Sequence, residues 1–350
     1  MKNPLKIIIF LIPFYFMLYI NYYVDSYACC RITYDGIASK MALGYDLLIK
    51  AEYNERNLCL SLIKKQKEKP ELAVVGSSRS GLFDAGCFDG IDKCINLFMS
   101  GANLEDYKGV IGTLEYYNKM PKHVILEING SLFNKYEDSR YLDLEDAIHY
   151  YTALVNKEKA SYHEKCLGFD MIKFFSPSYF LYNLKQLMEG KRFEVIFDKN
   201  VPMEKHFDGS FTPPNENIDD MEFVMNTTNE IIEKGVIYGL GKIDITDEKK
   251  KDFEQMVDFL QERGVNVMLY IPPYSKPIYE YMRSEEKYNP VLATEDYILD
   301  YASKKGIQVY GSFNPDYCGL QMEDLYDAYH IRKKAIMKTY YLREEIKYGN

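Results

Sequence analysis

Apolar residues recur along this chain in two patterns: short continuous runs, and longer stretches at helical spacing. The runs 72–75 and 123–128 are too short for buried helices and contain β-branched residues, so they predict buried strands. Between them, apolar residues at helical spacing predict an amphipathic helix over about 103–118. The same reasoning predicts strands at 93–99, 265–271 and 307–310, helices at 247–263 and 293–305, and a final helix beginning near His330. This alternation predicts an α/β fold with a parallel sheet and right-handed crossovers.

The N-terminal region has a different pattern. Residues 7–24 form an apolar stretch of 18 residues, broken only by Pro13 and Asn21, which is near the minimum length of a membrane-spanning helix. Basic residues precede this stretch, so the positive-inside rule places the N-terminus in the cytoplasm and the remaining chain outside it. A cleaved signal peptide is the alternative, because Ser26-Tyr27-Ala28 resembles a cleavage site. Either interpretation exports the rest of the chain.

These patterns divide the chain into three parts. Residues 1–28 are expected to form a cytoplasmic stub and a single transmembrane anchor, and 29–70 a connector. Residues 71–350 are expected to form one domain, interrupted at about 131–245 by an aromatic-rich insertion. Within this insertion, helices are predicted around 142–156 and 178–188.

Charge and cysteine content exclude several classes of function. The chain has 43 basic and 52 acidic residues, a net charge of -9, which argues against a nucleic-acid partner. Seven scattered cysteines without a CxxC pair argue against a zinc site, and their odd number excludes a fully paired set of disulfides. Cys87 and Cys94 remain a candidate disulfide or two buried thiols. The absence of a GxGxxG motif weighs against nucleotide binding, so no cofactor is predicted.

Chemically useful residues follow the predicted strands. Gly76 and three serines, at positions 77, 78 and 80, come directly after the first strand of the domain. Gly101 and Asn129 follow the next two strands. Because the carboxyl ends of parallel strands meet at one edge of a sheet, these residues are expected to lie close together. The Ser78 and Gly101 N–H groups and the Asn129 amide could then stabilise an oxyanion.

Asp327 and His330 form a further candidate pair. Residues three apart at the start of a helix share a face, so the aspartate could orient the histidine and leave its other nitrogen to take a proton from a serine. Asp324 is a rival for the orienting role. The alternative for Asp327 and His330 is a helix cap beside a histidine with a purely structural role.

Together these residues resemble the sequence blocks of the SGNH/GDSL hydrolases. Gly76-Ser77-Ser78 is similar to the GDS block, Gly101 and Asn129 to the second and third blocks, and Asp327-to-His330 to the final DxxH. Order and spacing fit over roughly residues 71–345. The residues around the first and last blocks most resemble DltD-like lipoteichoic-acid D-alanylation proteins and exported polysaccharide O-acetylation proteins. Two departures stand out: Ser77 replaces an aspartate, and Glu127 stands where the third block usually has glycine.

The resemblance implies a three-layer α/β/α flavodoxin-like fold and a catalytic triad of Ser78, His330 and Asp327. Ser78 is preferred over Ser77 and Ser80 because the family nucleophile is the third residue of its block. Arg79 could contact an anionic substrate group or pair with a local acid.

The function expected from this resemblance is that of an extracytoplasmic serine esterase or O-acyltransferase. Its substrate would be an acyl ester of a cell-surface glycan or polyol polymer, and a membrane-bound O-acyltransferase would be a partner. The alternative is a non-catalytic, membrane-anchored module that binds a polymer or scaffolds such an enzyme.

Overall fold

The computed structural model of the protein describes residues 4–136 and 138–339. The chain forms two compact units. One consists of Met1–Lys65 and Glu164–Phe207, and the other of Gln66–His163 and Asp208–Asn350. The segment expected to be a connector therefore folds into a unit with part of the expected insertion.

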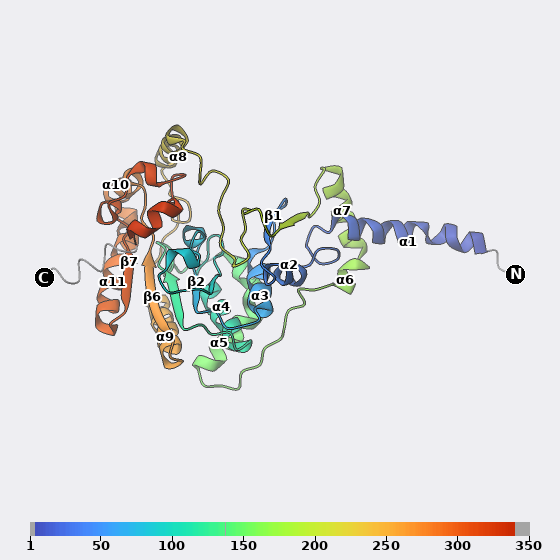
Figure 1. The fold of residues 1–350 in the computed structure, drawn as a ribbon, viewed down its shortest axis with the longest axis horizontal. Helices are drawn as coiled ribbons and strands as arrows, with labels where there is room; N and C mark the ends of the chain where they lie inside the picture. The colour runs from blue at the N-terminus through green and yellow to red at the C-terminus, as the bar shows by residue number, and fades with distance from the viewer. Residues whose placement is uncertain (1–3, 137, 340–350) are drawn as a thin grey trace. The chain divides into compact units, whose positions relative to one another are not determined.

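The second unit is built on a five-stranded parallel sheet with the order β3-β2-β4-β6-β7 (Figure 1). The strands are β2 (Leu72–Val75), β3 (Cys94–Asn96), β4 (His123–Glu127), β6 (Asn266–Ile271) and β7 (Gln308–Gly311). The first strand of the unit, β2, lies inside the sheet. The next strand, β3, pairs with one edge of β2, and the later strands β4, β6 and β7 continue the sheet from its other edge. This order is that of the flavodoxin-like doubly wound sheets, so the α/β class is confirmed and the sheet is compatible with that fold.

Helices flank this sheet (Figure 1). They are α4 (Leu104–Tyr116), α5 (Glu145–Val155), α8 (Met221–Lys234), α9 (Asp247–Glu262), α10 (Lys276–Ser284) and α11 (Asn289–Lys305). The start of α4 is specified locally, because Asn103 and Asp106 form a reciprocal capping box. Four of the helices were predicted within a few residues, whereas α8 and α10 were not.

Both faces of the sheet are covered. All four residues of β2 are buried, and β6 is buried after its first residue. On one face, alternate strand residues such as Leu72, Val74 and Ile125 pack in a cluster with Phe83 and with five residues near the C-terminus: Leu325, Tyr326, Ile331, Ala335 and Ile336. Burying one such side chain stabilises the fold by roughly 1.5–3 kcal/mol. The polar residues that follow the strands lie outside this core, at the carboxyl ends.

The first unit contains a two-stranded antiparallel sheet and five helices among the described residues. The strands β1 (Asp46–Ile49) and β5 (Val195–Asp198) pair with each other. The helices are α1 (Pro4–Val24), α2 (Tyr34–Met41), α3 (Glu55–Lys65), α6 (Met171–Phe174) and α7 (Pro177–Met188). Near its C-terminal end, α1 is held by the Asn21 amide, which donates to the Phe174 and Ser176 carbonyl oxygens.

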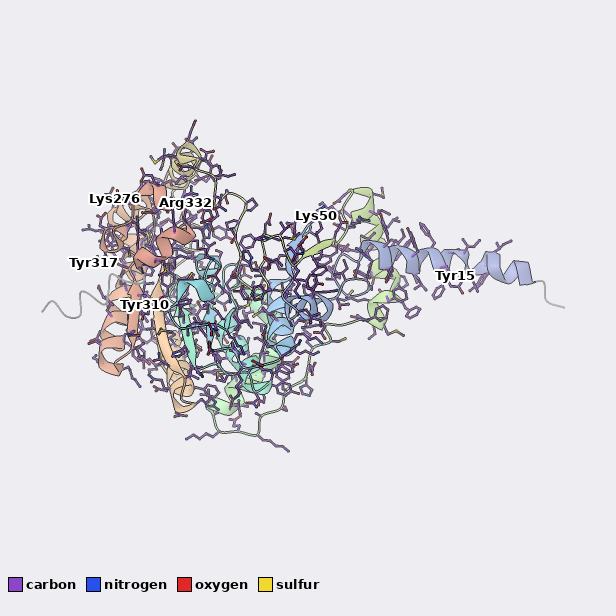
Figure 2. The ribbon with its side chains drawn as sticks, in the orientation of Figure 1. Tyr15, Lys50, Lys276, Tyr310, Tyr317 and Arg332 are labelled. Carbon is purple, nitrogen blue, oxygen red and sulfur yellow. The ribbon has the colours of Figure 1, made fainter. Side chains whose placement is uncertain are left out.

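The helix α1 coincides with the predicted membrane anchor. Apolar and aromatic side chains on it are exposed, including Tyr15, which projects from the helix in Figure 2. Across the residues that the structure describes, however, no helix is long and apolar enough to cross a membrane. The predicted transmembrane helix is therefore not supported by the structure.

The predicted final helix begins at residue 333, close to His330, but Asp327 and His330 do not lie in its first turn as expected. Residues 325–331 instead form a turn closed by an antiparallel bridge between Leu325 and Ile331. Of the two alternatives for Cys87 and Cys94, the structure shows free thiols. Cys87 instead donates a hydrogen bond to Asp84, and burial raises the pKa of the Cys87 thiol to about 11.

Candidate active site

The loop after β2, residues 76–80, presents the candidate nucleophile; we call it the nucleophile loop. Close packing explains the glycine at its start. A Cβ on Gly76 would clash with Ser80 Oγ and lie 2.6 Å from the Glu127 Cβ. Gly76 is not among the residues with a left-handed backbone conformation. A glycine is therefore needed here because there is no room for a side chain, and not because of the backbone angles.

Glu127, at the end of β4, binds this loop through hydrogen bonds from Ser77. Its side chain is fully buried, and both carboxylate oxygens accept hydrogen bonds from Ser77. The Ser77 N–H donates to Oε2 over 2.8 Å, and the Ser77 hydroxyl donates to Oε1 over 2.5 Å. The two residues that depart from the SGNH/GDSL pattern are therefore bonded to each other. The family pattern has an aspartate where this chain has Ser77. Here a carboxylate is supplied instead by Glu127, which contacts the same loop.

These contacts distinguish the three serines. Ser77 is bonded to Glu127, and the Ser80 hydroxyl donates to the Ser77 carbonyl oxygen in the interior. Ser78 Oγ lies 2.9 Å from His330 Nε2. Of the three hydroxyls, that of Ser78 is therefore the one placed to lose a proton to an imidazole.

His330 is in turn held by Asp327. Its Nδ1 lies 2.8 Å from one Asp327 carboxylate oxygen and 2.9 Å from the other. Burial opposes ionisation of this carboxyl, but the hydrogen bond and charge of His330, with two backbone N–H groups, lower the pKa of Asp327. An ionised Asp327 fixes the tautomer in which His330 Nδ1 carries the proton and Nε2 is free to accept one.

The histidine loop, residues 325–331, is shaped by the same aspartate. Asp327 Oδ1 accepts the backbone N–H groups of Tyr329 and His330, each over 2.8 Å. The Tyr326 ring stacks on the His330 ring, with centroids 5.4 Å apart and an angle of 6° between planes. Asp324, the rival orienting residue, binds Lys338 instead. Asp327 therefore both builds the turn and orients the imidazole.

A cavity of about 150 Å³ opens beside Ser78 and His330, and the three predicted oxyanion-binding residues line it. Gly101 has φ +62°, which side chains rarely tolerate. The Asn129 Oδ1 accepts the Ser131 N–H over 3.0 Å, and its Nδ2 donates to Ala102 O over 3.2 Å. The Asn129 side chain also forms a hydrogen bond with the buried Tyr107, so its role as an oxyanion donor stays a prediction.

Arg79 also lines the cavity, but its main contacts are internal. Its Nη2 donates to the carbonyl oxygens of Pro272 and Pro273, and its guanidinium lies 4.2 Å from the centre of the Tyr274 ring. These contacts fasten the nucleophile loop to the end of β6. Its buried Nε has no partner in the described part of the chain. The contact of Arg79 with an anionic substrate stays a prediction.

Sequence reasoning missed a second arginine at the site. A Cβ added to Gly101 would lie 2.7 Å from the Arg140 Nη2, so the guanidinium lies directly against this glycine. Asp138 holds Arg140 through its Nε and its backbone N–H. The Asp138 carbonyl in turn accepts the Asn103 amide at the start of α4. No local motif marks Arg140, because 39 residues separate it from Gly101 in the sequence.

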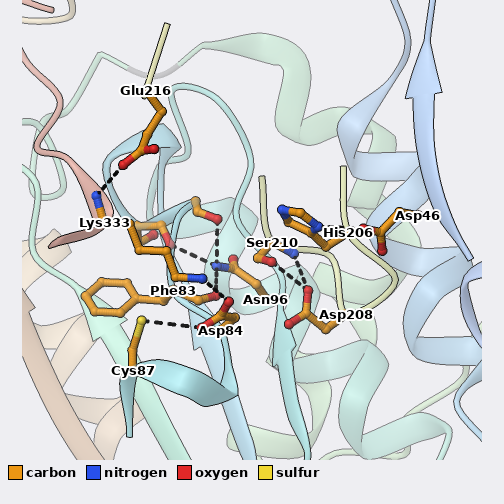
Figure 3. A network of polar contacts seen from close by, with 12 residues as sticks. Asp46, Phe83, Asp84, Cys87, Asn96, His206, Asp208, Ser210, Glu216 and Lys333 are labelled. Atoms are coloured by element: carbon orange, nitrogen blue, oxygen red, sulfur yellow. Dashed lines mark hydrogen bonds and ion pairs between the residues drawn. The ribbon is translucent and has the colours of Figure 1, made fainter. Parts of the chain in front are cut away.

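A polar network connects the segments that follow the nucleophile loop and the histidine loop (Figure 3). The Asn96 amide donates to three carbonyl oxygens at and just after the end of the nucleophile loop, those of Ser80, Gly81 and Phe83. Lys333, just beyond the histidine loop, forms an ion pair with Asp84. The segments that carry the nucleophile and the base are therefore tied to each other by side chains as well as by the core.

A larger cavity, of about 450 Å³, lies beside α11 and β7. Tyr317, labelled in Figure 2, lines it. Its one glutamate, Glu295, accepts hydrogen bonds from the Ser312 hydroxyl and the Phe313 N–H. Because no histidine is among its lining residues, this cavity lacks the paired nucleophile and base of the smaller one.

The geometry places the Ser78 hydroxyl and the His330 imidazole on one cavity, with the Asp327 carboxylate bonded to His330 and the predicted oxyanion-binding residues Gly101 and Asn129 in the cavity lining. Such an arrangement can carry out acyl transfer through a covalent intermediate. A scan against protein-family models finds no match for this chain, and a search of curated proteins finds none either.

Proposed function

We propose that this protein is a serine esterase or O-acyltransferase of the SGNH/GDSL type. The observation that carries the proposal is the continuous chain of contacts from Ser78 through His330 to Asp327 beside the cavity. The parallel sheet with flavodoxin-like strand order is the scaffold on which this family builds its site. The order of the four sequence blocks supports the same assignment.

The reaction begins when Ser78 Oγ attacks the carbonyl carbon of an acyl ester, while His330 Nε2 takes the hydroxyl proton. The N–H groups of Ser78 and Gly101 and the Asn129 amide stabilise the negative charge on the carbonyl oxygen. The intermediate collapses, His330 returns the proton to the leaving alcohol, and the acyl group stays on Ser78. Water or an acceptor hydroxyl then attacks the acyl-enzyme, with His330 again acting as base.

The substrate we propose is an acyl ester of a glycan or polyol polymer of the cell envelope. Tyr238 and Tyr329 line the cavity and offer aromatic surface to a sugar ring. A membrane-bound O-acyltransferase is the proposed partner if the acyl group is transferred. An outward-facing location of the domain belongs to the same proposal.

A fluorophosphonate probe tests the proposal directly, because it labels only an activated serine. We expect the wild-type protein to be labelled and the Ser78→Ala variant to remain unlabelled. Ser303→Ala, which removes a serine of the larger cavity, is the matched control and should label like the wild type. Equal labelling of wild type and Ser78→Ala would overturn the proposal and favour the non-catalytic binding module.

A further inference from the structure

A buried aspartate at the end of α1 organises a tight loop that carries two adjacent cysteines. Asp25 is fully buried, and its carboxylate accepts four successive backbone N–H groups. Those of Cys29 and Cys30 donate to Oδ1 over 2.9 Å each, and those of Arg31 and Ile32 donate to Oδ2 over 2.7 and 3.0 Å. The backbone is constrained further because Asp25 and Ala28 have φ of 47° and 51°. The loop is therefore held in one conformation.

This conformation turns both thiols to the same side. In an extended strand, adjacent side chains point to opposite faces, whereas here the Cys29 and Cys30 Sγ atoms lie 3.8 Å apart. The Tyr179 hydroxyl, on α7, is 3.6 Å from Cys29 Sγ. The cysteines are 8% and 5% exposed, so the pair is close to the surface of its unit without projecting from it.

The two thiols are chemically unequal. Either thiol can donate in the contact between Cys29 and Cys30. This contact, assisted by Tyr179, lowers the pKa of Cys29 despite burial of the group. The same contact and burial raise the pKa of Cys30. A thiolate is the attacking species in thiol–disulfide exchange, so Cys29 is the residue that reacts first.

A metal site explains this cluster less well. Asp25, Cys29 and Cys30 each offer one ligand atom, and the three atoms lie within 4.8 Å of one another. Its two oxygens are already occupied by the four N–H groups and by a contact of 3.3 Å with the Tyr179 hydroxyl. Only two sulfur ligands then remain, whereas a structural zinc ion takes four.

We propose that Cys29 and Cys30 are a vicinal redox pair that a disulfide compound converts reversibly into a Cys29–Cys30 disulfide. The Cys29 thiolate attacks one sulfur of the compound, forming a mixed disulfide and releasing one thiolate. Cys30 then gives up its proton and attacks Cys29 Sγ, which releases the second thiolate. The two cysteines lose two electrons and two protons, and the disulfide compound is reduced to two thiols. A disulfide between adjacent cysteines closes a small ring, and the hydrogen bonds to Asp25 hold the loop in a conformation that resists this closure. The Cys29–Cys30 disulfide should therefore be readily reduced again.

The test uses the full-length protein and 2,2′-dithiodipyridine, a small disulfide whose released pyridinethione is measured by absorbance. We expect the pair in wild-type protein to release about two equivalents of pyridinethione and to keep no pyridyl group. Peptide mass analysis should show residues 29 and 30 lighter by two hydrogens, and dithiothreitol should reverse the change. Cys29→Ser and Cys30→Ser should each release about one equivalent from the remaining thiol of the pair, in addition to the equivalent from Cys166, and should retain one pyridyl group on that thiol.

Cys166 is the internal control, because it is an exposed single thiol and should keep its pyridyl group in every variant. Circular dichroism of the two serine variants checks that the fold is retained. Two pyridyl groups on the wild-type pair would overturn the proposal. So would an unreacted pair after Cys166 has reacted completely, because it would show that the two thiols only fill space.

Discussion

The nucleophile loop and the histidine loop deliver the two reacting atoms of the candidate site in different ways. The first continues directly from a buried strand and is fastened by the buried Glu127, which lies on the neighbouring strand. The second has no strand or helix of its own and is shaped by Asp327, a residue within it. The nucleophile is therefore positioned from outside its loop, whereas the base is positioned from within.

This difference separates catalysis from loop support. Among the described residues, the hydrogen bonds of the Glu127 carboxylate go to Ser77 and not to the Ser78 hydroxyl or His330. Glu127 would therefore act on the proposed reaction through the position of Ser77. Asp327 contacts the imidazole and shapes the backbone that carries it. Substitutions at these two positions should therefore have different signatures, and the following predictions use them in order of expected effect.

The largest effect is expected from removal of a reacting group. Ser78→Ala or His330→Ala should lower kcat for ester hydrolysis by ~10⁶-fold, since such groups act as a unit. The double variant should be no worse than either single variant. Steady-state hydrolysis of p-nitrophenyl acetate measures kcat. If the loss of kcat in the double variant equalled the product of the two single losses, Ser78 and His330 would act independently, which would contradict a shared proton relay.

Asp327→Asn should lower kcat by ~10⁴-fold, because an amide favours the wrong imidazole tautomer. Its side-chain oxygen can still accept the two backbone N–H groups, so the histidine loop should be retained. Kinetics and circular dichroism together measure both effects. Asp324→Asn is the matched control, since Asp324 binds Lys338 and should leave kcat within a few-fold of wild type.

Glu127→Ala should lower kcat by ~10²-fold, the cost of a displaced nucleophile. It should also lower the free energy of unfolding by about 1–3 kcal/mol, because the Ser77 N–H and hydroxyl would be left unpaired in the interior. Glu127→Gln keeps the shape and an acceptor, so most of both losses should be restored. Urea denaturation and kinetics measure this, and equal losses in both variants would show that the charge itself is required.

Arg140→Gln should have a small and selective effect. Because Arg140 lies against Gly101 and is partly exposed, it should raise KM for an ester bearing a carboxylate by roughly fivefold. KM for the matched neutral ester should not change. Arg140→Lys should restore part of the affinity, and an equal change of KM for both esters would indicate that Arg140 only supports the Gly101 loop.

The smallest effect concerns the dependence of stability on pH. The pKa of Asp327 is lowered in the folded protein, so its ionised form stabilises the fold above the ordinary aspartate pKa of about 3.9. That contribution is lost as the pH falls through the lowered value. Urea denaturation at pH 7 and at pH 3 should show a larger loss for wild type than for Asp327→Asn. An equal loss of stability in both proteins would contradict this role of the ionised Asp327.

Local patterns were enough to predict much of the fold. The apolar runs that became β2, β4 and β6 were recognisable because a buried parallel strand is apolar on both faces. The helix α4 was predicted nearly to the residue, since its capping residues and apolar stripe lie in one segment. The histidine turn was predicted as a helix start because an Asp-to-His spacing of three suits either structure.

The sequence by itself determined the α/β class, the order of the polar residues along the strands, and the candidates Ser78, Gly101, Asn129, Asp327 and His330. Ser78 was already preferred among the three serines from the family resemblance, but only the tertiary structure shows its hydroxyl beside His330, because the two residues are 252 positions apart. It also decided that Glu127 serves Ser77, that Arg140 lies on Gly101, and that Cys29 and Cys30 point the same way. Such pairings depend on how strands and loops pack, and packing brings together residues that no local pattern connects.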